Sequence, residues 1–360
     1  GGVNLGASGT DFDGVRFNGS VSLGKSLAGV GDINDDGISD IILGSPWAPF
    51  NGLNSGGAHV VFGGQGLNGD VDLSTVGPAD DDAVAGFRLA GQLTFNTTTY
   101  TRTGTTVSSA GDFNADGIDD LLIGTALTGS TSYDGQTTLL FGRNTLFDEE
   151  QIVAPAIEDN TKALHFRGPP SSNTGETATD LGDVNGDGID DFAIGASSIF
   201  SNAGGAYVVF GGQDIANSAT LLTDVGGGVS GVVIAGEQVS DAAGQEMHSL
   251  GDINGDGIND IMIGAAGYDR EGGPDNGFSA GKAYIIYGGQ AALTSTLDLS
   301  DVGGSIAGFT FTGRRNSDGL GSNFSGLGDI NGDGYDDFAI AAQHASGSSN
   351  PRVAYVVLGG

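Results

Sequence analysis

Short apolar runs separated by glycine and polar residues dominate the sequence. One set follows an acidic stretch, as in "DIILG", "DLLIG" and "DFAIG", and a second set ends in glycine, as in "AHVVFGG", "AYVVFGG" and "AYIIYGG". Two further runs come before the acidic stretch, such as "KSLAGVGD" and, earlier in the chain, "GFRLAG". The runs are short and rich in β-branched and aromatic residues, which predicts β-strands. No stretch shows a helical period of useful length.

This order of four runs repeats five times. The acidic stretch reads "GDINDDGISDIILG" at residue 31, and related copies begin at residues 111, 182, 251 and 328. The copies lie roughly 70 residues apart, whereas the units of solenoid proteins usually have ~20 to 45 residues. The pattern therefore predicts an all-β fold, a β-propeller with five blades of four antiparallel strands, as a single domain over residues 1–360.

The two ends of the sequence predict how the propeller closes. The chain ends in "AYVVLGG", which matches the third strand of a unit. Its start, "GGVNLGASGTDFDGVRFNGS", parallels the link and fourth strand "LDLSDVGGSIAGFTFTGR" of another unit. We therefore expect the N-terminal strand, near residues 14–18, to complete the last blade. This pairing would remove the open edges of the sheets.

Composition narrows the range of partners. The 45 acidic residues outnumber the 12 lysines and arginines and give a net charge of −33, so nucleic acid and anionic membranes are poor partners and cations are good ones. The absence of cysteine excludes disulfides, thiolate metal sites and thiol redox chemistry. No apolar stretch approaches the ~20 residues that a membrane helix needs. We therefore expect no direct membrane insertion.

The acidic stretch has the pattern D-x-N-x-D-G-x-x-D, which we number as loop positions 1 to 9. Oxygen side chains occupy positions 1, 3, 5 and 9, position 7 offers its backbone carbonyl, and glycine at position 6 permits a sharp turn around an ion. Oxygen ligands in this number favour Ca²⁺ over Mg²⁺. An EF-hand would need flanking helices and Glu at position 12, where this chain has Leu or Ile.

The sequence thus predicts about five Ca²⁺ ions, in loops at residues 32–40, 112–120, 183–191, 252–260 and 329–337. Without a cation, carboxylates this close would repel one another and some would be protonated. A bound ion would convert this repulsion into a clamp between two strands. The predicted ligands are Asp32, Asn34, Asp36, Ile38 (carbonyl) and Asp40; Asp112, Asn114, Asp116, Ile118 and Asp120; Asp183, Asn185, Asp187, Ile189 and Asp191; Asp252, Asn254, Asp256, Ile258 and Asp260; and Asp329, Asn331, Asp333, Tyr335 and Asp337.

The pattern "GFRLAG…GDFNADGIDDLLIGT…TTLLFG", together with "LGSP" in the first unit, resembles the FG-GAP repeats of the integrin α-subunit N-terminal propeller. The resemblance covers essentially the whole chain. It implies four-stranded blades, Ca²⁺ in the loops between the first and second strands, and ligand contacts from the opposite face. Integrin propellers have seven blades, whereas this chain has five units and no visible von Willebrand-like insertion. The identity of the partner is therefore not carried over.

These features predict a calcium-binding extracellular interaction or adhesion module, secreted or at the cell surface. Extracellular Ca²⁺ modules often bind with dissociation constants of ~10⁻⁴ to 10⁻³ M, so the sites would be filled outside the cell. The expected partner is an extracellular protein or a glycan. The alternatives are a carbohydrate-binding lectin, a polysaccharide-acting enzyme and a structural spacer in a larger surface protein. We expect no enzymatic activity, because no nucleophile, phosphate-loop or metalloprotease motif is present.

The loops opposite the calcium face are the candidate ligand site. The first unit contains "SPWAPFNGLNSGG" with the only tryptophan, whose ring would bind a sugar or a protein if exposed and would be structural if buried against a neighbouring blade. The segments "GYDREGG" and "GRRNSDG" contain arginines in a strongly acidic protein. These arginines would either bind a ligand or form an internal ion pair. The candidate residues are Trp47, Phe50, Tyr268, Arg270, Arg314 and Arg315.

Histidine is scarce in this chain. His59, His165 and His248 fall within predicted strands. We therefore expect them to be packed in the fold rather than catalytic.

Overall fold

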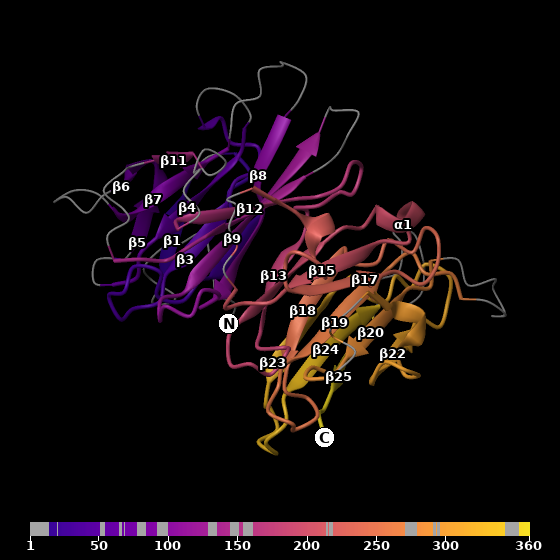
Figure 1. Ribbon diagram of the computed structural model, residues 1–360. Coiled ribbons are helices and arrows are strands. Elements are labelled where there is room, and N and C mark those ends of the chain that lie inside the picture. The colour runs from indigo at the N-terminus through magenta and orange to yellow at the C-terminus, as the bar shows by residue number, and fades with distance from the viewer. Residues whose placement is uncertain are drawn as a thin grey trace.

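The computed structural model gives an all-β architecture, drawn in Figure 1. It describes residues 14–19, 21–50, 55–64, 67, 69–77, 84–91, 100–128, 135–144, 151–153, 161–213, 215, 219–270, 279–290, 293, 296–342 and 353–360. One short helix, α1 (Ile199–Asn202), is the only α-helix among these residues. No helix in the described part of the chain is long and apolar enough to cross a membrane. The prediction of an all-β fold is confirmed.

Each of the five sequence units forms its own antiparallel sheet. In the first four units the strands pair in the order first, second, third and fourth, whereas the described part of unit five has three strands. Unit one has β2 (Ser26–Gly29), β3 (Ile41–Gly44), β4 (Gly57–Val61) and β7 (Val84–Ala90); unit two has β8 (Tyr100–Gly111), β9 (Asp120–Thr128), β10 (Gln136–Leu140) and β12 (Ala163–Arg167); unit three has β13 (Ala178–Gly182), β14 (Asp191–Gly195), β15 (Gly205–Val209) and β17 (Gly231–Ala235); unit four has β18 (Glu246–Gly251), β19 (Asp260–Ala265), β20 (Lys282–Ile286) and β22 (Gly308–Thr312); and unit five has β23 (Phe324–Gly328), β24 (Asp337–Ala342) and β25 (Val353–Val357).

Short strands in the links join one unit to the unit before it. The link between the third and fourth strands of a unit pairs in parallel with the fourth strand of the preceding unit. This arrangement joins β11 (Gln151–Val153) to β7, β16 (Ala219–Leu221) to β12, and β21 (Leu297–Asp298) to β17. In unit one, β6 (Val76–Gly77) also pairs with β7.

The predicted closure of the last blade is not present in the structure. The N-terminal strand β1 (Val15–Asn18) pairs in parallel with the link strand β5 (Gly69–Asp72) of unit one, and the partner of β25 is β24. The prediction that residues 14–18 complete unit five is therefore wrong, and the described sheets do not form a closed ring. The link segment before β1 lies outside the described residues.

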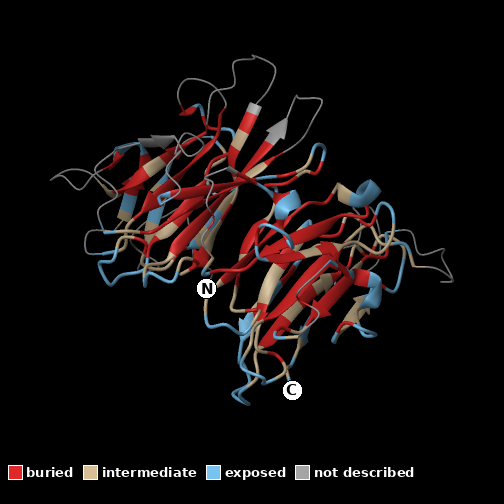
Figure 2. Cartoon of the chain, viewed as in Figure 1, coloured by how far each residue is buried: buried red, intermediate tan, exposed pale blue. Residues whose placement is uncertain are grey.

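The apolar core lies between successive units rather than within one sheet. Alternate residues of a strand point to opposite faces, and in β14 this places Phe192 and Ile194 against unit two and Ala193 against unit four. Similar clusters lie between units one and two and between units four and five. Figure 2 shows buried residues along the strands and exposed residues in the turns. Each sheet therefore needs a neighbour on both faces.

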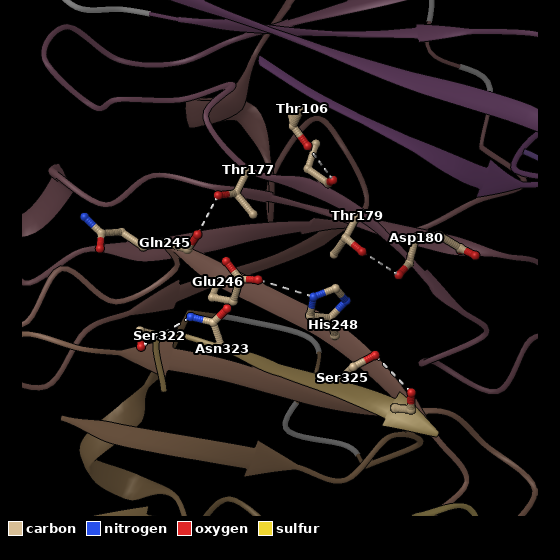
Figure 3. A network of polar contacts seen from close by, with 12 residues as sticks. Thr106, Thr177, Thr179, Asp180, Gln245, Glu246, His248, Ser322, Asn323 and Ser325 are labelled. Atoms are coloured by element: carbon tan, nitrogen blue, oxygen red, sulfur yellow. Dashed lines mark hydrogen bonds and ion pairs between the residues drawn. The ribbon is translucent and has the colours of Figure 1, made fainter. Parts of the chain in front are cut away.

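The first strands of successive units lie side by side and meet through polar groups (Figure 3). The Thr106 hydroxyl donates to the carbonyl of Ala178 at 3.4 Å, and the Thr177 hydroxyl donates to the carbonyl of Gln245 at 2.7 Å. On β18, His248 lies 3.4 Å from the Glu246 carboxylate. Side-chain hydrogen bonds between units thus supplement the apolar contacts.

The acidic loops, each joining a first strand to a second strand, also connect neighbouring units. The side chain at loop position 8 hydrogen-bonds the backbone near position 1 of the preceding loop. Asn259 does so by donating its amide to the Leu181 carbonyl at 2.9 Å. The carboxylates accept at 2.8–2.9 Å from the backbone N–H of position 1, in the pairs Asp119 with Asp32, Asp190 with Asp112, and Asp336 with Asp252.

Of the three histidines predicted to lie in strands, two are buried in strands as expected. His59 of β4 lies opposite Arg88 and packs against the Phe50 ring, with ring centroids 5.3 Å apart. His165 of β12 is buried beside the Thr138 hydroxyl at 3.0 Å. His248 is half-exposed and packs its ring edge-to-face on Phe324.

The burial of His59 predicts a pH-dependent stability. Burial, with a smaller contribution from Arg88, lowers the pKa of His59 to about 4 from 6.5. Between these values the unfolded chain binds a proton that the folded chain does not, so stability falls as the pH decreases from 6.5 to 4. The loss from this residue is about 3 kcal/mol. Chemical denaturation of the wild type and of His59→Leu at pH 7 and pH 4 checks this, and an equal loss in both proteins would contradict it.

The contact between loops predicts a cost for a side chain at Gly251. This residue has φ +73°, and an added Cβ would lie 2.0 Å from the Asp336 carboxylate of unit five. Gly251→Ala should destabilise the protein by about 1–3 kcal/mol more than Gly303→Ala. Gly303 is the matched control because it has φ +85° and its nearest atom is 3.7 Å away. Equal melting temperatures for the two variants would contradict the contact between units four and five.

Candidate metal centres

All five acidic loops lie between the first and second strands of their units, and position 9 begins or immediately precedes the second strand. The glycine at position 6 has a φ between +85° and +93° in every loop, a conformation that residues with a side chain rarely adopt. Position 4 also has a positive φ, for example +61° at Asp35 and +60° at Ala115. The chain therefore curves tightly at the place that the sequence predicts.

The side chains at positions 1, 3 and 5 turn toward the inside of this curve. In loop one the Asp32 carboxylate accepts hydrogen bonds from the backbone N–H groups of Asp36 and Gly37 at 3.0 and 2.6 Å. Asn34 accepts from Asp36 at 3.0 Å, and Asp36 accepts from Ile38 at 2.9 Å. The same bonds recur in the loops that begin at residues 112, 183, 252 and 329. Each loop thus gathers oxygen atoms on its inner side.

The aspartate at position 9 is buried in every loop and joins two parts of its unit. In loop one, one carboxylate oxygen of Asp40 accepts from the N–H of Ile33 at 3.1 Å and the other accepts from Gly63 at 2.8 Å, just after the third strand. The same pair of bonds forms at Asp191, Asp260 and Asp337. Asp120 differs because its Oδ2 atom is buried and has no hydrogen-bond partner.

Burial makes the charged form of four of these carboxyl groups, in loops one to four, unfavourable. It raises the pKa of Asp40 to about 6, of Asp191 and Asp260 to about 7, and of Asp120 to about 8. Backbone N–H groups oppose this increase, and the acidic groups at positions 1 and 5 add to it. The charges at positions 1 and 5 thus add to the cost of a charge at position 9 in loops one to four, which is the setting that a divalent cation would stabilise.

The residues at these positions fit a hard cation by their chemistry. All predicted side-chain donors are oxygen atoms, and the unpaired Oδ2 of buried Asp120 is an available acceptor. Within the described residues, no group of three or more acidic, histidine or cysteine side chains is already placed to hold a metal ion. The individual ligand assignments in the five loops stay predictions.

The aromatic candidates of unit one have different environments. Phe50 is buried with Ala48 and Ala90, so its ring belongs to the core. Trp47 is partly exposed, and the Arg102 guanidinium lies 3.9 Å from the centre of its ring. The Trp47 backbone N–H donates to the Ser22 hydroxyl at 3.0 Å, which anchors the loop to unit one.

The candidates of units four and five lie near one another. Arg270 donates to the carbonyl of Arg314 at 2.7 Å, which connects the loop after β19 to the loop after β22. The backbone N–H groups of Arg314 and Arg315 both donate to the Asp318 carboxylate at 2.8 Å, and both arginine residues are exposed. Tyr268 packs against the core between units three and four and carries the Lys282 ammonium 4.8 Å above its ring.

Sequence reasoning missed the role of loop position 8. Four of the five loops have an acid or an amide at this position, and this recurrence is visible in the sequence. The side chain at position 8, however, hydrogen-bonds the neighbouring loop and not its own loop. Sequence reasoning also missed a partly buried cluster in which Glu237 accepts from the Tyr284 hydroxyl at 2.7 Å and pairs with Lys282. These residues are far apart in the sequence.

Comparison with known proteins agrees with the repeat pattern. Residues 249–286 and 321–356 match the family model of the FG-GAP repeat. These two segments contain the acidic loops of units four and five, together with the second strand of each unit.

Integrin α subunits are among the curated relatives. The chain is 29% identical over 181 residues to integrin alpha-PS2 of Drosophila melanogaster, a match that covers 49% of this chain and 11% of that protein. It is 27% identical over 197 residues to integrin alpha-5 of Xenopus laevis, with 53% of this chain and 16% of that protein covered. The match to integrin alpha-IIb of Mus musculus is 33% over 121 residues, with 33% and 10% covered. The chain spans less than a fifth of the length of these relatives. Units four and five thus match the FG-GAP repeat, and parts of the chain are similar to integrin α subunits.

Proposed function

We propose that residues 1–360 form one β-propeller domain of five units that binds a structural Ca²⁺ ion in each acidic loop and recognises an extracellular protein or glycan. The observation that carries the calcium proposal is the buried aspartate at position 9, which lies beside the carboxylates at positions 1 and 5 of its loop. Its recurrence in five loops argues against a chance acidic turn. The similarity to integrin α subunits supports an extracellular, non-enzymatic role.

In each loop the ion would be held by the side chains at positions 1, 3, 5 and 9 and by the carbonyl at position 7. Ca²⁺ supplies the positive charge that offsets the mutual repulsion of these groups. Position 9 already connects the start of its loop to the end of the third strand, as Asp40 connects Ile33 to Gly63. Neutralising the charge at position 9 would therefore stabilise the connection between the loop and the end of the third strand. Calcium would then have a structural role.

Ligand binding is proposed for the loops at the other end of the second strands. Trp47 and the two exposed arginines, Arg314 and Arg315, are the best candidates there, because Phe50 is buried and Tyr268 is partly covered by Lys282. The stack of Arg102 on Trp47 gives an aromatic surface held in a defined orientation. Such a surface suits a sugar ring or an apolar anchor of a protein.

Calcium removal should destabilise the domain strongly. A site with free Ca²⁺ at a hundred times its dissociation constant contributes ~2.7 kcal/mol to the free energy of unfolding. Adding a chelator should therefore lower the melting temperature by more than ~10 °C, as followed by circular dichroism. An unchanged melting curve in chelator would contradict structural calcium.

Substitutions in loop one test the ligand assignment. Asp36→Ala removes a predicted ligand at position 5, so calorimetric titration should show one Ca²⁺ site fewer. Asp35→Ala is the matched control, because it removes a neighbouring exposed charge and the equivalent residue of loop two is Ala115 in the same conformation. Loss of a site in both variants, or in neither, would refute the assignment of position 5.

Trp47→Ala should weaken ligand binding by about tenfold or more without a large loss of stability. The measurement is binding to an array of glycans and matrix proteins with millimolar Ca²⁺, followed by titration of the best ligand. Leu221→Ala controls for the loss of an exposed apolar side chain elsewhere. A large decrease in melting temperature would assign Trp47 to the fold, and a wild-type domain that binds nothing on the array would favour a structural spacer.

A further inference from the structure

We propose that a groove between units four and five binds an extended acidic segment of a protein partner, with Arg314 and Arg315 pairing with its carboxylate. The proposal rests on the proposed function, because it names the class of partner that the ligand-binding loops of these two units recognise. It is independent of the calcium sites. Two observations carry it: the positive charge in the wall of this groove, and the charged cluster that fills the corresponding place one unit earlier in the chain.

The groove has a volume of about 670 Å³ and lies between the loop after β22 and the third strand of unit five, β25. Phe311 of β22, together with Ile340 and Val357 of unit five, gives it an apolar wall. Ligand sites in proteins usually have ~300–1,000 Å³ and are mostly apolar with a few polar groups that fix the ligand. The groove therefore has the size and the lining of a site for part of a peptide.

Two arginines supply most of the charge in the wall. Arg314 and Arg315 both line the groove, and both side chains are exposed. In the described part of the chain, neither guanidinium forms an ion pair with a carboxylate. Asp318 also lines the groove, but its carboxylate accepts from the backbone N–H groups of the two arginine residues at 2.8 Å. The two guanidinium groups are thus available to an anionic ligand.

A third arginine lies beside the same loop. Arg270 donates to the Arg314 carbonyl at 2.7 Å, and its buried Nε atom has no hydrogen-bond partner among the described residues. Arg270, Arg314 and Arg315 are three of only 12 lysines and arginines in a chain with a net charge of −33. A local group of positive charges on such a protein attracts an anionic partner and disfavours a cationic one.

The junction between units three and four shows how the corresponding place is filled when the chain supplies its own acid. Glu237, in the loop after β17, accepts from the Tyr284 hydroxyl at 2.7 Å and pairs with Lys282. Lys282 and Tyr284 belong to β20, the third strand of unit four. A carboxylate is therefore held at this place between a tyrosine hydroxyl and a cation.

The loop that carries Glu237 has a close counterpart in the groove. The sequences "AGEQVSDAAG" and "TGRRNSDGLG" align without a gap, which places Arg314 at the position of Glu237. Asp241 and Asp318 accept the same backbone hydrogen bond in the two loops, at 3.0 and 2.8 Å, from the residue three positions earlier. The two loops therefore share this turn, but an arginine replaces the glutamate in the second.

The third strands complete the comparison. Alignment of "KAYII" with "VAYVV" places Val353 at the position of Lys282 and Tyr355 at the position of Tyr284. Both residues of unit five line the groove, and they are 37% and 45% exposed. Because valine is shorter than lysine and the glutamate is absent, unit five keeps a tyrosine and a cation but has no acid between them. A carboxylate from a partner would complete the arrangement of unit four.

The rest of the wall favours a peptide over an acidic glycan. The apolar residues, Phe311, Ile340 and Val357, suit an apolar side chain next to the acid, whereas a sugar needs several polar partners. Among the described strands, β25 pairs with β24 alone. Its outer edge can therefore form hydrogen bonds with the backbone of an extended segment. An acidic glycan is the other occupant that the experiment distinguishes.

Immobilised hexapeptides test the chemistry of the partner. Each acidic peptide has apolar residues around its glutamate or aspartate, and its counterpart has glutamine or asparagine instead. The chain of residues 1–360, in millimolar Ca²⁺, should bind its best acidic peptide about tenfold more tightly than the amide counterpart, because hydrogen bonds to charged groups are the stronger ones. Fluorescence anisotropy with soluble peptides gives the dissociation constants. Equal binding of the two peptides, or no binding of either, would overturn the proposal.

A substitution in the groove tests the site. Arg314→Gln should weaken binding of the best acidic peptide about tenfold. It should leave the melting temperature unchanged, because the hydrogen bonds of the loop use the backbone of this residue. Arg167→Gln is the matched control, since Arg167 is an exposed arginine at the end of β12, the fourth strand of unit two. An equal effect of the two substitutions would place the peptide elsewhere and overturn the proposal.

A double variant tests the comparison with unit four. Arg314→Glu with Val353→Lys introduces the acid and the lysine of unit four beside Tyr355. This variant should bind no acidic peptide, because its own carboxylate takes the place of the ligand, and it should melt at or above the temperature of the wild type. Acidic peptide binding by the folded variant would contradict the proposal. If the variant does not fold, Arg314→Gln still decides.

The array of glycans and matrix proteins described above is probed in parallel. Binding on that array without a preference for acidic peptides would overturn the present proposal and leave the proposed function intact. Tighter binding of uronic-acid oligosaccharides than of acidic peptides, sensitive to Arg314→Gln, would assign the groove to a glycan and overturn the peptide. No binding on either array would overturn both proposals for ligand recognition.

Discussion

The packing of one sheet face on the next is the contact on which the other features of this protein depend. Every unit has apolar side chains on both faces, and each of the three internal units buries one face against the unit before it and the other against the unit after it. No unit has a core of its own that would satisfy both faces. The stability of each unit is therefore coupled to its neighbours. The two units at the ends of the array expose apolar residues whose counterparts in the internal units are buried.

The acidic loops are placed by this packing. Each loop begins at the end of a first strand, and in loops two to five the position-8 side chain bonds the backbone near the start of the preceding loop. Its last aspartate is buried and bonds the backbone after the third strand. The charges that would bind a cation are thus fixed at the junction of two strands and beside a second unit. A cation there would strengthen contacts within a unit, and it would also hold the loop in the position that contacts the next unit.

The sequence predicted the strands and the loops well, because both depend on local patterns. Short β-branched runs between glycines define the strands, and the glycine at loop position 6 has the positive φ that its place in the motif requires. The sequence did not predict that Phe50 is buried while Trp47 is partly exposed, because the two residues stand in the same loop and have similar chemistry. It also did not predict the pairing of β1 with β5, since β1 resembles every other fourth strand and strand partners are not local.

The sequence by itself therefore determined the all-β class, the five repeated units, the positions of the acidic loops and the oxygen character of their side chains. These properties follow from residue type and spacing along the chain. The tertiary structure decided which carboxyl groups are buried and how far burial raises the pKa of each, which side chain reaches the next loop, and which faces are left open. Burial, desolvation and strand pairing depend on residues that are distant in sequence, so only the folded arrangement fixes them.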